Sequence, residues 1–178
     1  MNIVIKKLNP QDCTPEMLLH FNRYQEVKRC WRKIDSEWVL IDNPFIQEWD
    51  NERKSDVAKG LRHCINQGGV ALGAFDNDKL IGFASMPNQS FGTNNEYIQL
   101  EMLHVSYEYR GKGIGKDLFR EICDEAKFFG AKKFYISAHS SEESTGFYRS
   151  VGCVDAVEVN QRLFEEEPVD CHLEYSLH

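Results

Sequence analysis

Three glycines lie at alternate positions between two basic residues in the stretch YRGKGIGKDLF, residues 109–119. A helical pattern begins directly after them, with Leu118, Ile122, Ala126 and Phe129 on one face. Glycine has no side chain to pack and loses much conformational freedom on folding. It does allow backbone N–H groups to approach a ligand closely, and at a helix N-terminus that ligand is usually an anion. The stretch therefore predicts a turn into a helix that carries an anion site.

Two familiar phosphate-binding loops do not fit this stretch. A Walker A loop needs Ser or Thr after its Gly-Lys pair, but Asp117 follows Lys116 here. A dinucleotide fingerprint has the spacing G-x-G-x-x-G, whereas the spacing here is G-x-G-x-G. A tight turn without any ligand is the plain alternative, although three glycines in five residues favour the anion site.

The rest of the pattern predicts alternating strands and helices in a single domain over residues 1–178. Strands are expected over 2–7, 70–76, 79–86, 97–105 and 132–138, helices over 14–24, 51–67, 114–129 and 141–152, a hairpin within 28–49 that turns at 35–36, a loop over 87–96, and a last antiparallel pair over 153–163 and 170–177. This order predicts an α/β (α+β) fold, with helices on both faces of a mostly antiparallel sheet.

Composition excludes several classes of protein. The formal net charge of −7 argues against a nucleic-acid partner, which normally meets a basic face. No apolar run approaches the ~18 residues of a membrane span, and the N-terminus lacks a signal-peptide pattern, so we expect no membrane partner and a cytoplasmic location. The six cysteines are scattered and do not match zinc spacing, so we expect most of them to be buried and free, with no metal site.

The segment Arg110–Gly115 resembles the R/Q-x-x-G-x-G/A motif of the GNAT superfamily of N-acetyltransferases, in its bacterial type. A second family motif is matched by Phe147, Tyr148 and Gly152, where Cys153 stands in place of the usual phenylalanine. The resemblance covers most of the chain. It implies the GNAT fold, in which helices cover both faces of a central mixed, mostly antiparallel sheet of about seven strands.

The resemblance also implies a binding site for acetyl-CoA as co-substrate. The amides of the glycine loop would hold its pyrophosphate, and the backbone of residues 103–105 would pair with its pantetheine arm. Ser141 stands where the family commonly has a cofactor-binding asparagine, and it reaches less far. The implied contacts are Leu103, His104, Val105, Arg110, Gly111, Lys112, Gly113, Ile114, Gly115, Lys116 and Ser141.

Acetyl transfer from a thioester to an amine requires a base for the amine and an acid for the leaving thiolate, but no metal. Tyr148 is the candidate acid, with simple packing beside Phe147 as its alternative. Glu101 is the candidate base, because a carboxylate inside an apolar strand would be partly desolvated and have a raised pKa. The stretch around it is similar to spermidine/spermine acetyltransferases. Glu101 could instead point to solvent at a splayed strand, and Glu96 and His104 are weaker candidates.

All three tryptophans of the chain, Trp31, Trp38 and Trp49, fall within a Trp-rich insertion at about 28–49. Among several acidic residues they could form a pocket for a cationic acceptor. They could equally form a local core or the interface of a homodimer.

We therefore expect an acetyl-CoA-dependent N-acetyltransferase that acetylates a primary amine of a small molecule by direct transfer in a ternary complex. One alternative is a sensor that binds acyl-CoA without turnover. A second alternative keeps the enzyme but makes the acceptor a protein N-terminus or lysine. Acceptor specificity depends on variable loops, so the acceptor itself does not follow from the fold.

Overall fold

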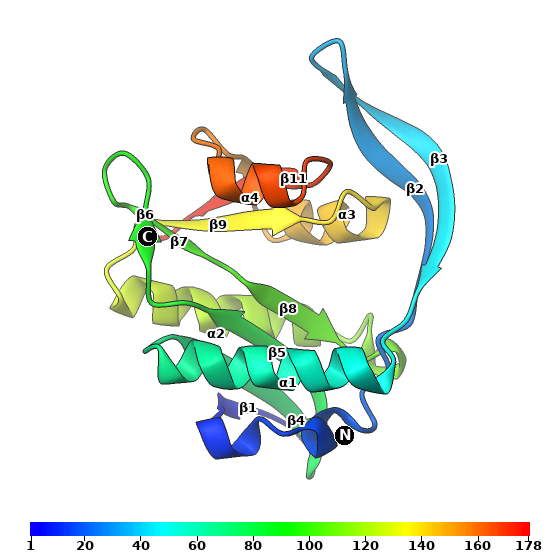
Figure 1. Ribbon diagram of the computed structural model, residues 1–178, viewed down its shortest axis with the longest axis vertical. Coiled ribbons are helices and arrows are strands. Elements are labelled where there is room, and N and C mark those ends of the chain that lie inside the picture. Colours follow the sequence, from blue (N-terminus) through cyan, green and yellow to red (C-terminus); the bar gives the residue numbers. More distant parts are fainter.

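A computed structural model describes all 178 residues (Figure 1). The strands are β1 (Ile3–Lys7), β2 (Gln25–Ile34), β3 (Glu37–Gln47), β4 (Val70–Asp76), β5 (Lys79–Met86), β6 (Ser90–Phe91), β7 (Tyr97–Gln99), β8 (Met102–Val105), β9 (Lys133–Ala138), β10 (Val154–Asp155) and β11 (Cys171–Ser176). The α-helices are α1 (Asn51–Asn66), α2 (Ile114–Phe128), α3 (Glu142–Ser150) and α4 (Gln161–Glu166). Short 3-10 helices cover Pro10–Asp12, Pro15–Leu18 and Tyr107–Tyr109.

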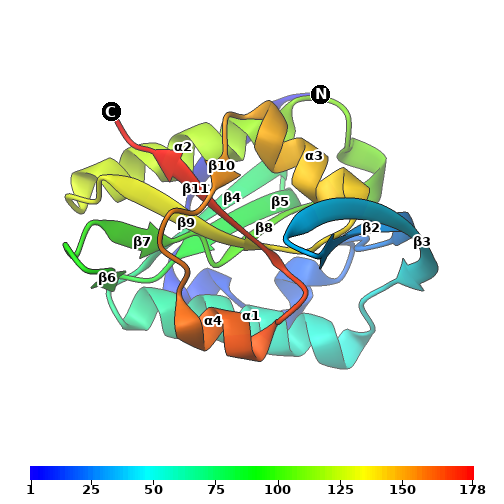
Figure 2. The same ribbon diagram turned by 90° about the horizontal axis from the view of Figure 1, so that it is seen from above.

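The strands form two main sheets and a separate hairpin. One sheet has the order β1-β4-β5-β8 and the other has the order β10-β11-β9-β7-β6, while β2 and β3 form the hairpin. A bridge between Cys30 on β2 and Ser141 ties the hairpin to the segment after β9. All strand pairs are antiparallel except β7 with β9. Helices α1 and α4 lie on one side of the sheets, and α2 and α3 lie on the other (Figure 2). The predicted mixed fold with helices on both faces is confirmed.

The strand predicted over residues 97–105 is divided between the two sheets. The amide of Leu100 donates to the carbonyl of Tyr135 on β9 at 2.9 Å, whereas the next amide, of Glu101, donates to the carbonyl of Ser85 on β5 at 2.8 Å. The two sheets therefore diverge between β7 and β8, and the prediction of one continuous strand is wrong at this point. We call residues 100–101 the fork. As a result β8 is the last strand of its sheet, and its outer edge has no strand partner.

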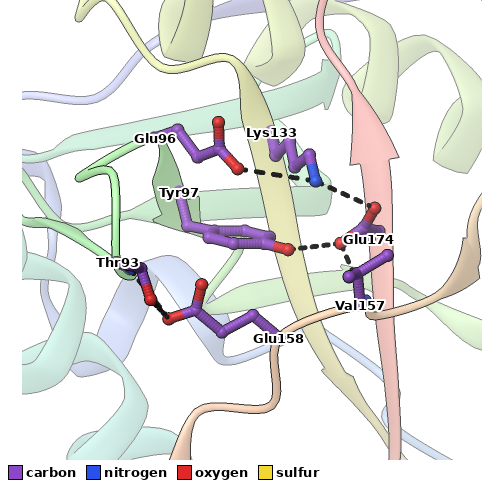
Figure 3. Close-up of polar contacts among 7 residues, drawn as sticks. All are labelled: Thr93, Glu96, Tyr97, Lys133, Val157, Glu158 and Glu174. Atoms are coloured by element: carbon purple, nitrogen blue, oxygen red, sulfur yellow. Dashed lines mark hydrogen bonds and ion pairs between the residues drawn. The ribbon is translucent and has the colours of Figure 1, made fainter.

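A buried polar network holds β7 against β9 and β11 (Figure 3). The hydroxyl of Tyr97 donates to the carboxylate of Glu174, which also accepts the amide of Val157 at 3.1 Å. Lys133 Nζ lies 3.3 Å from Glu174 and 3.5 Å from Glu96. Burial alone would raise the pKa of Glu174, but these hydrogen bonds and the lysine charge together lower it. The network therefore keeps a buried carboxylate ionised and paired.

Helix α2 is positioned by its apolar face, as its sequence pattern predicts. Leu118, Ile122 and Ala126 are fully buried in the main core cluster, which also contains residues of β4, β5, β9 and β11. Gly82 on β5 lets the helix come close, because a Cβ at that position would lie 2.9 Å from Leu118 Cδ1. This packing fixes the start of α2 beside the end of β8.

The six cysteines of the chain are all buried and free.

Two further predicted elements differ from the structure. The segment 14–24 is not a continuous helix, because the backbone N–H and C=O of Asn22 bond to Ser106 Oγ and to the amide of Tyr107, both at 2.9 Å. The segment 153–163 pairs with β11 only at β10, and α4 follows it. Asn160 starts that helix by accepting the amide of Leu163 with its side chain at 3.1 Å. The predicted turn of the hairpin is confirmed, since Asp35 and Ser36 both have positive φ.

Candidate active site

A cavity of about 540 Å³ opens where the first turn of α2, the outer edge of β8 and helix α3 meet. Its walls are formed by Arg23, Gln25, Leu103, His104, Val105, Tyr109, Arg110, Gly111, Gly113, Ile114, Gly115, Lys116, Glu143, Ser144, Phe147 and Tyr148. Ten of these residues carry a predicted role, nine of them as cofactor contacts and the tenth, Tyr148, as the acid. The cavity therefore brings together the glycine loop, the strand before it and the Phe-Tyr helix that follows much later in the chain.

The first turn of α2 presents backbone donors without a protein acceptor. Gly113 occupies the N-cap position with a φ of +87°, and it has no side chain to cap the helix. Gly111 also has a positive φ, of +74°, and a Cβ added at either glycine would meet no atom within 4 Å. Uncapped N–H groups and the positive end of the helix dipole together attract an anion. The local geometry is therefore that of an anion site open to the cavity.

Gly115 serves a different purpose from the other two glycines. A Cβ at this position would lie 3.1 Å from Cε2 of Phe147 on α3. The absence of a side chain lets Phe147 pack against the first turn of α2. The third glycine of the motif thus sets the distance between α2 and α3 as well as lining the cavity.

The outer edge of β8 forms the opposite wall. Leu103, His104 and Val105 line the cavity, and β8 pairs on its other side with β5. An unpaired strand edge can accept an extended ligand as if it were another strand. The loop is tied to this strand, because Arg110 Nε donates to the carbonyl of Val105 at 3.0 Å.

His104 is held neutral by its surroundings. Burial is the main cause that lowers its pKa to about 3, and the positive charges of Arg23, Arg110 and Arg53 add to the effect. Arg23 Nε donates to His104 Nδ1 at 3.1 Å, so this nitrogen accepts and the other nitrogen carries the proton. A histidine whose free lone pair is already used cannot accept a proton from an amine. The structure therefore speaks against His104 as the base.

Tyr148 lies on α3 with its half-buried ring in the cavity wall. Its ring packs edge-on against Phe147, with a centroid distance of 5.2 Å, and against Phe119 on α2 at 6.4 Å. Burial, followed by the neighbouring Cys153, raises the pKa of Tyr148. Its phenol therefore stays protonated at neutral pH, which is the form a general acid requires.

Glu101 does not have the environment that its sequence context predicts. It lies at the fork rather than inside a strand, its side chain is exposed, and it does not line the cavity. Its carboxylate is close to Cys64 on α1, where burial and then the Glu101 charge raise the pKa of the thiol to about 12. The expectation of a desolvated carboxylate at this position is wrong, because the separation of the two sheets opens the fork to solvent.

Two predicted cofactor contacts lie outside the cavity walls. Ser141 is buried and caps α3, with its Oγ accepting the amide of Ser144 at 3.2 Å and the side chain of Gln25 at 3.4 Å. Lys112 is exposed, and its Nζ donates to the carbonyl of Glu108 at 3.0 Å. The serine therefore orders the start of α3, and it is the neighbouring Ser144 that reaches the cavity.

The three tryptophans do not come together in one pocket. Trp31 and Trp38, on the hairpin, pack against the main core cluster. Trp49 instead stacks with Phe21 at a centroid distance of 6.1 Å and belongs to the core cluster beside α1. Trp49 also lines a second cavity of about 470 Å³. A single acceptor pocket made by all three tryptophans is therefore not formed.

Four cavity residues carry no signal in the sequence: Arg23, Gln25, Tyr109 and Glu143. Ser144 and Phe147 also line the cavity, and both match positions of the second family motif, but no contact was predicted for them. Arg23 lies just before the hairpin and Gln25 is the first residue of its strand β2, more than 80 residues before the loop they face. No local spacing connects them to the glycine motif, so only the fold brings them to it.

The described chain contains no cluster of three or more histidine, cysteine or acidic side chains that could hold a metal ion. None of its helices is both long and apolar enough to span a lipid bilayer.

The chain is similar in sequence to one acetyltransferase and to one protein described as uncharacterized. A streptothricin acetyltransferase of Streptomyces lavendulae is 32% identical over 100 residues, which span 55% of this chain and 50% of the relative. An uncharacterized protein of Mycobacterium leprae is 26% identical over 149 residues, which span 83% of this chain and 37% of the relative. The chain thus matches half or less of the length of these two curated relatives.

Solved structures show the same fold at low sequence identity. A nourseothricin acetyltransferase superposes with a TM-score of 0.73 at 14% identity, over 100% of both chains. A Bacillus anthracis protein described as a streptothricin acetyltransferase, solved with acetyl coenzyme A, has a TM-score of 0.72 at 18% identity, over 100% of this chain and 99% of the other. The family model described as the acetyltransferase (GNAT) family matches residues 24–153, which include the hairpin, the glycine loop and α3. The chain therefore belongs to the GNAT acetyltransferase family.

Proposed function

We propose that the protein is an N-acetyltransferase that moves an acetyl group from acetyl-CoA to a primary amine of a small molecule. One observation carries this proposal. A single cavity joins an uncapped helix start, a free strand edge and a protonated tyrosine. These are the three elements that a bound acyl thioester needs: a phosphate site, a partner for its extended arm and a proton donor.

The residues present fit acetyl-CoA in both shape and charge. The open space at Gly111 and Gly113 leaves room for phosphate oxygens beside the N–H groups of the first turn of α2. Arg110 and Lys116 add positive charge at the same wall. The backbone of residues 103–105 offers the edge along which an extended arm can pair. Of the cofactor contacts predicted from the sequence, we propose that the nine residues lining the cavity bind acetyl-CoA.

The proposed chemistry is direct transfer. Acetyl-CoA, when bound, supplies an activated thioester. The neutral amine attacks the carbonyl carbon and forms a C–N bond, the C–S bond breaks with its electron pair on sulfur, and the amine gives up one proton. Tyr148 supplies a proton to the leaving sulfur and is then reprotonated from solvent. We retain Glu101 as the proposed acceptor of the amine proton, through water, because it lies two residues from the cavity-lining Leu103.

Relatives support a small-molecule acceptor. Similar proteins include streptothricin, nourseothricin and aminoglycoside 6'-N-acetyltransferases. The likeness to spermidine/spermine acetyltransferases around Glu101 stays a prediction, as does the direct transfer in a ternary complex.

The test of this function has two steps. Calorimetric titration should show that acetyl-CoA and CoA bind, and thiol release should then be measured with acetyl-CoA and a panel of small amines. At least one amine should release free thiol at a rate that depends on both substrates. Tight binding of acetyl-CoA with no acetylation of any amine or peptide would instead favour the sensor.

A further inference from the structure

Arg23 lies at the boundary between two cavities of the protein. It lines the cavity formed by the glycine loop and β8, and it also lines the second cavity beside Trp49. The second cavity contains no residue of the glycine loop or of β8. A group held by Arg23 from that side would therefore be part of a different molecule from one whose phosphates occupy the loop.

The guanidinium of Arg23 has no acidic partner. It forms none of the ion pairs of the protein, and its Nη1 is buried without a hydrogen-bond acceptor. The contacts it does make are neutral: Nε donates to His104 Nδ1 at 3.1 Å, and its Cζ lies 5.7 Å from the centre of a Trp49 ring. Burial and the nearby charge of Arg110 lower its pKa to about 10, so it is still charged at neutral pH.

This arrangement is costly unless a ligand completes it. A partly buried guanidinium with an unused donor loses hydration without the compensation that a carboxylate gives. Arg110 adds further positive charge in the same region, as its effect on the pKa of Arg23 shows. Two carboxylates, Glu48 and Asp50, line the second cavity, but both are exposed, and Asp50 is engaged in capping α1 through the amide of Arg53 at 2.7 Å.

We infer that the acceptor amine carries a carboxylate, which Arg23 binds at the boundary of the two cavities. The inference rests on the proposed transferase function and narrows its substrate class to amino acids and other amino-carboxylates. A planar guanidinium binds a carboxylate with two parallel hydrogen bonds, which would use the donor that is now without an acceptor. The same positive region would repel an acceptor whose only charges are ammonium groups.

The test measures binding, so it does not depend on turnover. The probes are lysine, ornithine and unbranched ω-amino-carboxylates of two to six carbons, each compared with its own carboxamide. They are titrated into CoA-saturated protein by calorimetry. We expect at least one carboxylate to bind about tenfold or more tightly than its amide, and Arg23→Met to abolish that difference. Arg53→Met is the matched control, because this exposed arginine also lies near Trp49, at 5.8 Å, but lines neither cavity.

Three outcomes would overturn the inference. The first is that no carboxylate of the panel binds at millimolar concentration, and the second is that every carboxylate and its amide bind equally. The third is that Arg23→Met weakens CoA binding tenfold or more while the preference for carboxylates persists, which would assign the guanidinium to the cofactor phosphates. If a carboxylate binds through Arg23 but is never acetylated, the inference about the ligand holds and the proposed transferase function fails.

Discussion

The amides of Leu100 and Glu101 are adjacent in the chain but donate to different sheets, one to Tyr135 on β9 and the other to Ser85 on β5. This divergence separates β8 from β9 and leaves one edge of β8 without a partner. The free edge lines the cavity opposite the first turn of α2. The fork therefore creates the free strand edge that forms one wall of the cavity.

Cofactor binding should depend on the open conformation of the glycine loop. Gly113→Ala should weaken CoA binding by about tenfold or more, because the new Cβ would enter the space next to the uncapped amides. The change also places alanine at a positive φ, which costs about 1–2 kcal/mol. Gly130→Ala is the matched control, since Gly130 has a φ of +83° and an equally open Cβ position at the other end of α2. Equal CoA affinities of the two variants in calorimetry would contradict the loop assignment.

Tyr148 should act on the chemical step more than on binding. Tyr148→Phe keeps the ring that packs on Phe147 and removes only the hydroxyl. We expect kcat to fall by ~10²-fold or more, which is about 2.7 kcal/mol of transition-state stabilisation. The Kd of acetyl-CoA should change little, because backbone groups provide most of that binding. Tyr175→Phe, which removes a hydroxyl outside the cavity walls, is the control. Unchanged turnover of Tyr148→Phe would remove this residue from the mechanism.

Glu101 should matter most where the amine is protonated. A primary amine has a pKa near 10, so a base assists at pH 7 and is less necessary at pH 9.5. Glu101→Gln should therefore reduce kcat/KM strongly at pH 7 and only weakly at pH 9.5. Glu121→Gln, at an exposed position on α2, should leave the pH profile unchanged. A loss of equal size at every pH would show that Glu101 binds or supports structure instead.

The buried network of Figure 3 predicts a pH-dependent stability. The pKa of Glu174 is lower in the folded protein than in the unfolded chain, so the network stabilises the fold above the unfolded pKa of about 4.3 and loses this effect as the pH falls further. Glu174→Gln should lower the free energy of unfolding at pH 7 by about 1–3 kcal/mol. Urea titrations should show that this difference from the wild type narrows below pH 4.

A surface pair provides the comparison for this prediction. Asp124 and Lys127 form an exposed ion pair on α2, with their charged atoms 3.3 Å apart. Asp124→Asn should change the free energy of unfolding by less than about 0.5 kcal/mol, because solvent screens an exposed pair. If the free energies of unfolding of Glu174→Gln and wild type differ by the same amount from pH 7 to pH 3.5, the charge of the carboxylate contributes nothing to stability.

The sequence by itself determined the features that depend on neighbouring residues. The glycines at 111 and 113, together with the apolar face of α2, predict an uncapped helix start because both the permitted φ and the helical period are local properties. The hairpin turn at Asp35 and Ser36 and the cap of α1 at Asp50 are local in the same sense. The Phe-Tyr pair on α3 could be placed in the site only through the resemblance to a family.

Only the tertiary structure decided the features that depend on distant contacts. The fork at Leu100 and Glu101 arises because their amides bond to different sheets. It exposes the carboxylate of Glu101, which the apolar pattern predicts to be buried. Arg23 meets His104 across 81 residues of sequence, and no periodicity encodes such a distance. The tryptophans separate for the same reason, since Trp31 and Trp38 pack against one core cluster and Trp49 packs against another. Burial and charge pairing are sums over neighbours in three dimensions, and those neighbours exist only once the chain has folded.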